Sequence, residues 1–295
     1  MLKRGWICPP GGGGRRKRKM IPKVIHYCWF GRGPLPDLAK TCIASWKKYC
    51  PDYEIREWNE DNFDIACCDF AKEAYQEKRW AFVSDYARLK VIFQYGGIYL
   101  DTDVELVRSL DPLLEHKCYL ATESSGFVAS GLGFGAEKGS RILQELLEEY
   151  EKQHFRLPDG TLDVEPCPQK NTFPLYKYGY RFSAKEIWKT DDVTVYPPEY
   201  FCPLDYETRS FHRTENTYSI HHYSALWIPE DVKELEKKIK EVDRTRNKCV
   251  AFVIHNCMRY SFYKKKGEER SVFGYVYKRL KLKYHRMKTK RKRQT

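Results

Sequence analysis

One stretch of the sequence constrains the fold of this chain more than any other. It consists of a helical segment, two glycines and a short apolar strand that two carboxylates follow. Residues 70–95 form a mostly helical pattern, and the glycine pair that follows it is typical of a helix end. Residues 98–100 then form an apolar strand, and Asp101 and Asp103 follow it directly. This order predicts an α/β fold in which acidic side chains stand at the end of a strand.

The beginning of the chain shows a unit of the same kind. Residues 23–30 (KVIHYCWF) are a predicted buried strand, and a turn rich in Gly and Pro follows them. We expect Asp37 to cap a helix that runs to about Tyr49, and residues 53–58 (YEIREW) alternate like a second strand. A strand, a helix and a strand in this order indicate a nucleotide-binding α/β unit.

The remainder of the chain gives weaker patterns. We expect a strand over 118–122, a Gly-rich loop over 126–135, a helix over 140–153 and a charged helix over 230–246. Residues 155–218 are irregular, with many Pro and Tyr residues, which suits a substrate-binding region built from loops. The longest clear apolar stretch, 249–254, is a buried strand or part of a core helix and is too short to span a bilayer.

The net charge of +13 is concentrated at the two ends of the chain. The first 20 residues include seven basic residues and no acids, residues 278–295 include ten and no acids, and the rest has a net charge of −4. Such ends usually meet anionic lipid or nucleic acid, or are only solvated. We therefore expect a basic disordered extension or a wrongly chosen start over 1–19, a folded domain over 20–270 that begins at Met20, and a basic aromatic tail over 271–295.

Asp101 and Asp103 are the candidate metal ligands. Hard cations such as Mg²⁺ and Mn²⁺ prefer oxygen ligands and accept substrate phosphates in the same coordination shell. One or two carboxylates and a diphosphate complete such a shell without further protein ligands. By itself an Asp-x-Asp sequence is more often a turn or a solvated strand end, so the neighbouring residues decide between the two interpretations.

One helix earlier, Asp85 and Arg88 are three positions apart and therefore share a helix face. They are either a surface ion pair of modest energy or groups that bind an anionic substrate. The planar guanidinium of arginine matches anionic oxygens. In the functional interpretation, Arg88 contacts phosphates or sugar, and Asp85 contacts hydroxyl groups.

These residues belong to a longer run, SDYARLKVIFQYGGIYLDTDVEL at residues 84–106, which resembles the signature of glycosyltransferase family 32. This family contains DXD-motif enzymes of capsular polysaccharide synthesis and fungal mannosyltransferases, and it is similar to the core of the large glucosylating bacterial toxins. The opening IPKVIHYCWFG at residues 21–31 resembles the family's first strand, and YSIHHYSALW at residues 218–227 resembles its closing segment. The resemblance therefore spans residues 21–227.

The resemblance implies a GT-A-like α/β fold, with a mixed sheet flanked by helices, and it implies a role for each matching residue. Trp29 would stack on the donor's base, and the alternative is a core position on a buried strand. Asp101 and Asp103 would bind ribose and metal. The implied donor-binding residues are Trp29, Ser84, Asp85, Arg88, Gly97, Tyr99 and Asp101.

His221 and His222 are further candidates near the metal, because neutral imidazole is a good ligand for Mn²⁺-like ions. The sequence leaves open which of the two binds, and a structural histidine is the alternative. Leu226 stands where the family usually has Ser, which puts a hydroxyl contact from this segment to the phosphate in doubt. Glu123 and the Gly-rich loop are candidates either for contacts to sugar or acceptor or for a structural role.

The implied reaction is a metal-dependent transfer of a hexose from a nucleoside-diphosphate sugar to a hydroxyl of a glycan acceptor, with retention of the anomeric configuration. The cofactor would be Mn²⁺ or Mg²⁺, and no catalytic base is assigned, because the departing phosphate can take the acceptor proton. The expected acceptor is a surface glycan on a lipid carrier, made in capsular or exopolysaccharide synthesis. The basic tail would hold the enzyme at the anionic inner face of the membrane, in the cytoplasm, where scattered cysteines stay reduced.

Two other functions remain open. One is a glucosyltransferase that modifies a protein, as the toxins do. The other is a nucleic-acid-binding protein, which rests on the basic ends alone; no recognised binding module accompanies them, so we expect no specific nucleic-acid partner. A steep salt dependence of DNA affinity would support the second function, whereas loss of sugar-nucleotide hydrolysis on metal chelation would support an enzyme.

Overall fold

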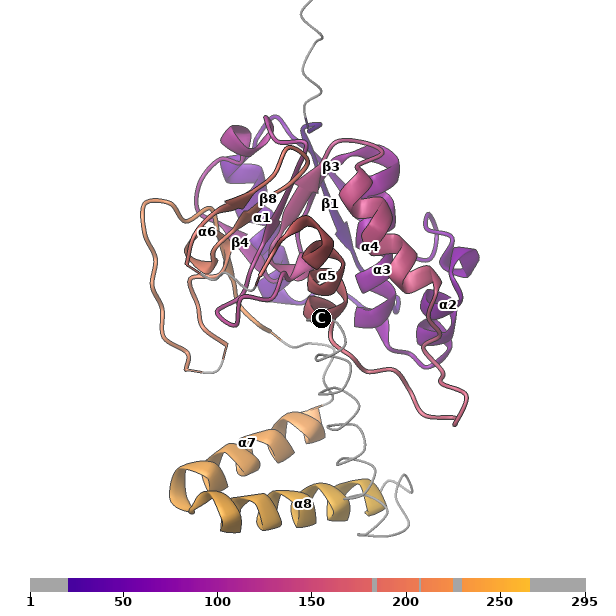
Figure 1. The fold of residues 1–295 in the computed structure, drawn as a ribbon, viewed down its shortest axis with the longest axis vertical. Helices are drawn as coiled ribbons and strands as arrows, with labels where there is room; N and C mark the ends of the chain where they lie inside the picture. The colour runs from indigo at the N-terminus through magenta and orange to yellow at the C-terminus, as the bar shows by residue number, and fades with distance from the viewer. Residues whose placement is uncertain (1–20, 182–184, 207, 225–229, 266–295) are drawn as a thin grey trace, which may run out of the picture. The chain divides into compact units, whose positions relative to one another are not determined.

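The computed structural model of the chain describes residues 21–181, 185–206, 208–224 and 230–265. The expected extension over 1–19, the start at Met20, Leu226 and the tail over 271–295 lie outside these residues. The described residues form two compact units, one that ends at Tyr223 and one that begins at Ser224, and Figure 1 labels their helices and several of their strands.

The first unit is built on a seven-stranded sheet with the order β2-β1-β3-β6-β5-β8-β7. The strands β2, β1 and β3 are parallel, whereas β6 runs antiparallel to both β3 and β5, so the sheet is mixed. The bounds are β1 Val24–Cys28, β2 Glu54–Trp58, β3 Gly97–Tyr99, β5 Cys118–Ala121, β6 Phe134–Ala136, β7 Trp188–Lys189 and β8 Thr194–Tyr196. A separate two-stranded sheet pairs β4 (Val104–Leu106) with β9 (Ser219–His221).

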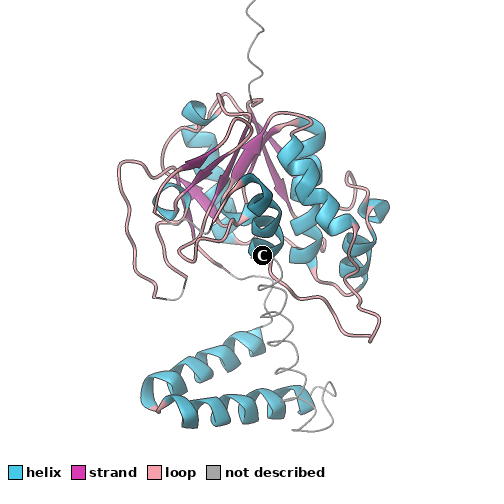
Figure 2. Ribbon diagram, in the orientation of Figure 1, coloured by secondary structure: helices cyan, strands magenta, loops and turns pink. Residues whose placement is uncertain are grey.

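Helices cover both faces of the large sheet, as Figure 2 shows. On one face, α1 (Asp37–Tyr49) buries Cys42 and Trp46 against strand residues that include Ile25 and Ile98. On the other face, α2 (Asp69–Gln76), α3 (Trp80–Tyr95) and α4 (Arg141–Glu151) form a second core with Tyr99 and other strand residues. Neighbouring residues of a strand point to opposite faces, which is why Ile98 and Tyr99 belong to different cores. The predicted α/β fold, with a mixed sheet flanked by helices, is confirmed.

Several predicted elements differ in detail from the structure. Asp37 is the first residue of α1 rather than its cap, and its side chain accepts a hydrogen bond from Lys40 instead. The helical pattern over 70–95 is broken near Lys78, which has a φ of 55°. The Gly-rich loop contains a 3₁₀ turn, η3 (Ser130–Leu132), and strand β6.

The irregular region over 155–218 also contains regular structure. Its elements are α5 (Cys167–Thr172), the 3₁₀ helix η4 (Phe173–Tyr178), β7, β8 and α6 (Pro198–Phe201). Two of them are strands of the large sheet, so this region completes the sheet and is not built from loops alone. Short 3₁₀ turns also occur at η1 (Ile65–Cys67) and η2 (Asp111–Leu113).

Gly97 is required by close packing at the start of β3. It has a φ of 113°, and a Cβ atom there would lie 2.8 Å from both His26 Nε2 and the Val24 carbonyl oxygen. His26 is buried, with Nδ1 accepting a hydrogen bond from Trp58 Nε1 at 3.0 Å and Nε2 lying 3.0 Å from the Gly96 carbonyl oxygen. Burial lowers the pKa of His26 to about 4, so the imidazole is neutral and Nε2 donates to Gly96.

The second unit contains α7 (Glu230–Thr245) and α8 (Lys248–Lys265), which lie side by side (Figure 1). Among its described side chains, the buried apolar ones are those of Leu235, Ile239 and Ala251. Val250 and Val253 of α8, in the stretch expected to be buried, are 43% and 59% exposed. None of the helices in the described part of the chain is long and apolar enough to cross a membrane.

Candidate active site

The parallel strands β2, β1 and β3 place the candidate residues at one edge of the sheet. The register pairs His26 of β1 with Tyr99 of β3, so Trp29 after β1 and Asp101 after β3 leave the sheet at the same edge. In open α/β sheets, ligands bind beyond the carboxyl ends of parallel strands. The sequence-predicted residues are therefore gathered where such a fold offers a binding site.

Asp101, Asp103 and His221 form a cluster with metal-ligand chemistry. Their ligand atoms all lie within 4.8 Å of one another. Strand β9 pairs with β4, which begins directly after the acidic triplet, and the register places His221 opposite Val104. As a result His221 Nε2 lies 3.2 Å from Asp103 Oδ1, although the two residues are far apart in the sequence.

The second histidine points elsewhere. His221, at the end of β9, faces Asp103, whereas Nε2 of His222 lies 2.9 Å from Glu105 Oε2. Only its backbone N–H reaches the acidic triplet, where it donates to the Asp103 carbonyl oxygen at 3.0 Å. Of the two histidines that the sequence left open, the structure therefore brings His221 into the cluster.

The donor set of this cluster fits a divalent metal ion. His221 Nδ1 is buried and has no hydrogen-bond partner among the residues that the structure describes. Two carboxylates and one imidazole suit Mn²⁺ somewhat better than Mg²⁺, which prefers oxygen ligands alone. Burial lowers the pKa of His221, but the nearby Asp103 and Asp101 together outweigh it and raise this pKa above its usual value.

Arg88 holds the Asp101 carboxylate in place. Its Nη1 lies 3.3 Å from both Asp101 oxygens, and its guanidinium also pairs with Asp85 and contacts the Cys167 thiol. The Tyr99 hydroxyl donates to Asp101 Oδ1 at 2.8 Å. Arg88 is only 4% exposed, so the alternative of a surface ion pair with Asp85 is wrong. Burial raises the pKa of Asp101, and Arg88 opposes that rise.

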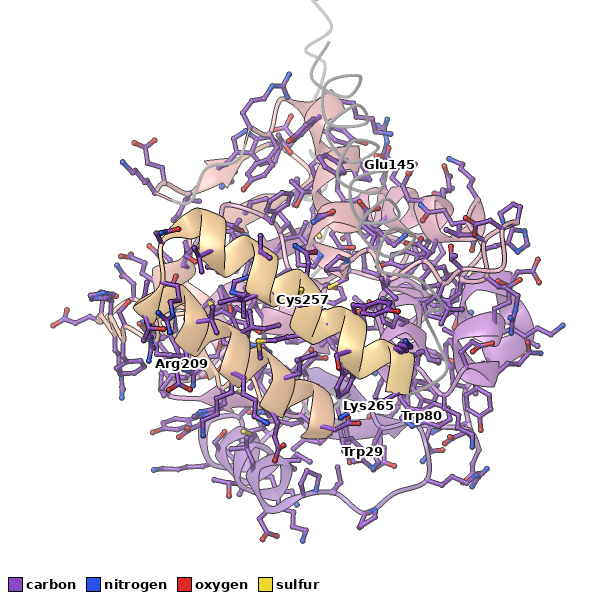
Figure 3. All side chains as sticks on the ribbon, turned by 90° about the horizontal axis from the view of Figure 1, so that it is seen from below. Trp29, Trp80, Glu145, Arg209, Cys257 and Lys265 are labelled. Carbon is purple, nitrogen blue, oxygen red and sulfur yellow. The ribbon has the colours of Figure 1, made fainter. Side chains whose placement is uncertain are left out.

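The other predicted donor-binding residues lie at different depths. Trp29 directly follows β1, is half-buried and packs against the core that contains Trp46, and its Nε1 donates to the Gly33 carbonyl oxygen at 2.6 Å. It is labelled in Figure 3. Ser84 is half-buried on α3. Gly97 and Tyr99 are buried, so Gly97 serves strand packing and Tyr99 orients Asp101.

Gly131 is a residue of the site that the sequence did not single out. A Cβ atom at this position would lie 2.4 Å from Asp101 Oδ2 and 3.1 Å from Arg88 Nη1. The η3 turn therefore lies directly against the carboxylate, and any side chain would displace it. The Gly-rich composition of residues 126–135 was the only signal, and it does not say which glycine meets the acidic triplet.

Comparison with known proteins agrees with this arrangement. Residues 36–120 match the family described as a glycosyltransferase sugar-binding region containing a DXD motif. Inositol phosphoceramide mannosyltransferase 3 of Schizosaccharomyces pombe is 30% identical over 144 residues, which cover 46% of this chain and 38% of that protein. Alpha-1,4-N-acetylglucosaminyltransferase of Homo sapiens is 27% identical over 161 residues, which cover 52% and 45%. The chain spans less than half the length of these two relatives.

Among solved structures, the PaToxG glycosyltransferase has a TM-score of 0.44 and 20% identity, and the match covers 54% of this chain and 70% of that one. The DXD motif of this protein is Asp101-Thr102-Asp103, which follows β3 of a mixed sheet flanked by helices. The mixed sheet flanked by helices, with the acidic triplet directly after β3, agrees with the GT-A-like fold that the resemblance implied. Residues 36–120, which include Asp101 and Asp103, are thus similar to the glycosyltransferase sugar-binding region that contains a DXD motif.

Proposed function

We propose that this protein transfers a hexose from a nucleoside-diphosphate sugar to a hydroxyl group of a glycan or glycolipid. The observation that carries the proposal is the convergence of Asp101, Asp103 and His221 at the carboxyl edge of the parallel strands. This edge is the usual position of a nucleotide in α/β folds. Trp29 leaves the same edge after β1, half-buried, and in the proposal it stacks on the base of the donor.

The cluster binds Mn²⁺ or Mg²⁺ in this proposal, and the ion neutralises charge on the departing diphosphate when bound. Asp101, Asp103 and His221 are its ligands. Arg88 and Tyr99 keep Asp101 oriented through the contacts at 3.3 Å and 2.8 Å. Such partners of a ligand matter, since their loss typically lowers metal affinity or activity about 10–100-fold.

We propose that the transfer retains the anomeric configuration. The acceptor oxygen forms its bond to the anomeric carbon on the face from which the diphosphate departs. The bond between the anomeric carbon and the phosphate oxygen breaks, and the departing phosphate takes the acceptor proton. This route needs no protein nucleophile or base, so none is assigned.

We further propose a lipid-linked acceptor and a peripheral position at the cytoplasmic face of the membrane. The relatives include proteins named for ceramide substrates, inositol phosphoceramide and lactosylceramide. Ten basic residues and no acids occur between 278 and 295, in the part of the chain outside the described residues. Each Lys or Arg near an anionic surface contributes about 1 kcal/mol. Capsular or exopolysaccharide synthesis is the process that suits such an acceptor.

Hydrolysis and transfer assays over a panel of nucleotide sugars test the proposal. At least one donor should be turned over with Mn²⁺ or Mg²⁺, and excess EDTA should abolish the activity. Asp103→Asn and His221→Gln should each lower turnover by more than about 100-fold, since they remove metal ligands rather than outer partners. His222→Gln is the matched control, because its ring bonds to Glu105 instead. Unchanged turnover in excess EDTA, or equal losses in the two histidine variants, would contradict the proposed metal site.

A further inference from the structure

A polar pocket lies next to the metal-ligand cluster and has no assigned role. It has a volume of about 360 Å³, and the residues that line it are Glu123, Ser124, Ser125, Asp205, Tyr206 and Tyr223. They come from the turn after β5, the segment after α6 and the residues after β9. The volume is within the range of about 300–1,000 Å³ that is usual for small-molecule sites.

Tyr223 is the wall between this pocket and the metal-ligand cluster. Its ring packs edge-on against the imidazole of His221, with the ring centroids 4.2 Å apart and the planes at 87°. Its hydroxyl lies 2.9 Å from the Cys202 thiol. Tyr223 also has a φ of 51°, a conformation that non-glycine residues adopt rarely and that costs free energy. The Tyr223 ring is thus held between the pocket and the His221 imidazole.

The pocket has the chemistry of a sugar site. Glu123 and Asp205 line it with carboxylates. The Ser125 hydroxyl donates to Glu123 Oε1 at 2.8 Å, and the Thr208 hydroxyl donates to Asp205 Oδ1 at 2.8 Å. Carboxylates accept strong hydrogen bonds from hydroxyl groups. Tyr206 is 47% exposed, and its ring centroid lies 5.2 Å from that of Tyr223, so the pocket has an aromatic wall with an accessible ring.

The charge of the pocket selects against phosphate. None of its six lining residues is basic, and two are acidic. A diphosphate or another anion in this space would meet like charges, which is unfavourable. An uncharged molecule rich in hydroxyl groups would not.

We infer that this pocket binds the acceptor, and specifically the neutral sugar residue that carries the reacting hydroxyl group. The inference rests on the proposed transferase function. The donor's base and diphosphate belong to the edge with Trp29 and Asp101, and the acceptor sugar occupies the neighbouring pocket, which Tyr223 lines next to His221. The acidic pocket makes acceptors with a phosphate or carboxylate on that sugar poor substrates.

Binding of neutral monosaccharides to the full chain tests the inference independently of turnover. The probes are methyl glycosides of glucose, galactose, mannose and N-acetylglucosamine, with glucose 6-phosphate as the anionic comparison, in saturation-transfer NMR titrations. At least one methyl glycoside should bind, and glucose 6-phosphate should bind more weakly. Tyr206→Ala and Asp205→Asn should each weaken the glycoside about tenfold, the loss expected for one strong contact.

Phe211→Ala is the matched control, because Phe211 is an exposed aromatic residue (51%) of the same segment that does not line the pocket. Equal glycoside binding by wild type and Tyr206→Ala, or tighter binding of glucose 6-phosphate, would overturn the inference. In transfer assays, Tyr206→Ala should raise KM for the acceptor and not for the donor, and the reverse would assign the pocket to the donor. The protein could bind a glycoside through Tyr206 and yet turn over no donor. That result would support the sugar pocket and refute the proposed function.

Discussion

Replacing Gly131 by alanine would press a methyl group onto the Asp101 carboxylate. The added carbon would lie 2.4 Å from Asp101 Oδ2, whereas ordinary contacts begin at 3.4 Å, so the carboxylate must move by about 1 Å. The backbone of Gly131 is outside the left-handed region, so alanine adds no backbone strain there. A misplacement of about 1 Å in a catalytic group can lower the rate about 100-fold. We therefore expect Gly131→Ala to lower donor turnover about 100-fold.

Donor hydrolysis, Mn²⁺ affinity by EPR titration and urea unfolding together check this expectation. Crowding of this kind costs about 1–3 kcal/mol of unfolding free energy, so a control with similar instability is needed. Gly160→Ala provides it, because Gly160 has a φ of 78° with open space around it, and alanine in that conformation costs about 1–2 kcal/mol. The control should lose stability but keep turnover and Mn²⁺ affinity. Wild-type turnover in Gly131→Ala would refute the role given to the η3 turn.

Three further predictions concern other parts of the chain. Arg88→Lys keeps the charge but cannot span two carboxylates, so turnover should fall, and the free energy of unfolding in urea should drop by up to about 3 kcal/mol. Normal kinetics together with that loss of stability would make Arg88 purely structural. The pKa of His26 is about 4 in the folded protein and about 6.5 in the unfolded chain. The neutral imidazole therefore contributes its full stabilisation of the fold above pH 6.5, and this stabilisation is lost as the pH falls towards 4. Unfolding by urea should show about 2 kcal/mol less stability at pH 5 than at pH 7 from this group, a dependence that His26→Gln should lack. A chain truncated after Tyr277 should still hydrolyse the donor but should not sediment with vesicles rich in anionic lipid. The full chain should sediment with these vesicles at low salt and detach near ~0.5 M salt. Equal sedimentation of the two chains would place any membrane contact elsewhere.

Elements with a strong local signal could be predicted from the sequence. The helix predicted to follow Asp37 and run to about Tyr49 spans Asp37–Tyr49 in the structure, because its apolar residues repeat with helical spacing and a turn precedes it. The strand at residues 118–122 was also correct to within one residue. Strands β4, β6 and β9 were missed, because each has three residues and exists only through pairing with a distant partner. In β6 the sequence Phe-Gly-Ala also carries a glycine, which favours a loop when judged locally.

The site shows the same division between local and long-range information. Asp101 and Asp103 could be identified because the apolar strand and the acidic triplet are adjacent in the sequence. The choice between His221 and His222 could not be made, since neighbours on a strand face opposite sides and only the register with β4 decides. Gly131 was missed for a similar reason, because its contact with Asp101 joins segments 30 positions apart.

The charges of the described cluster give a physical reason for a divalent cation there. Asp85, Asp101 and Asp103 bring three carboxylates together, and Arg88 supplies the one guanidinium that contacts two of them. The Asp103 charge adds to the rise in the pKa of Asp101, next to burial, and Asp103 also raises the pKa of His221. Both shifts mean that the folded cluster favours additional positive charge, as a proton or as a metal ion. A bound cation supplies this positive charge while the carboxylates stay ionised, and the proposed function requires ionised carboxylates.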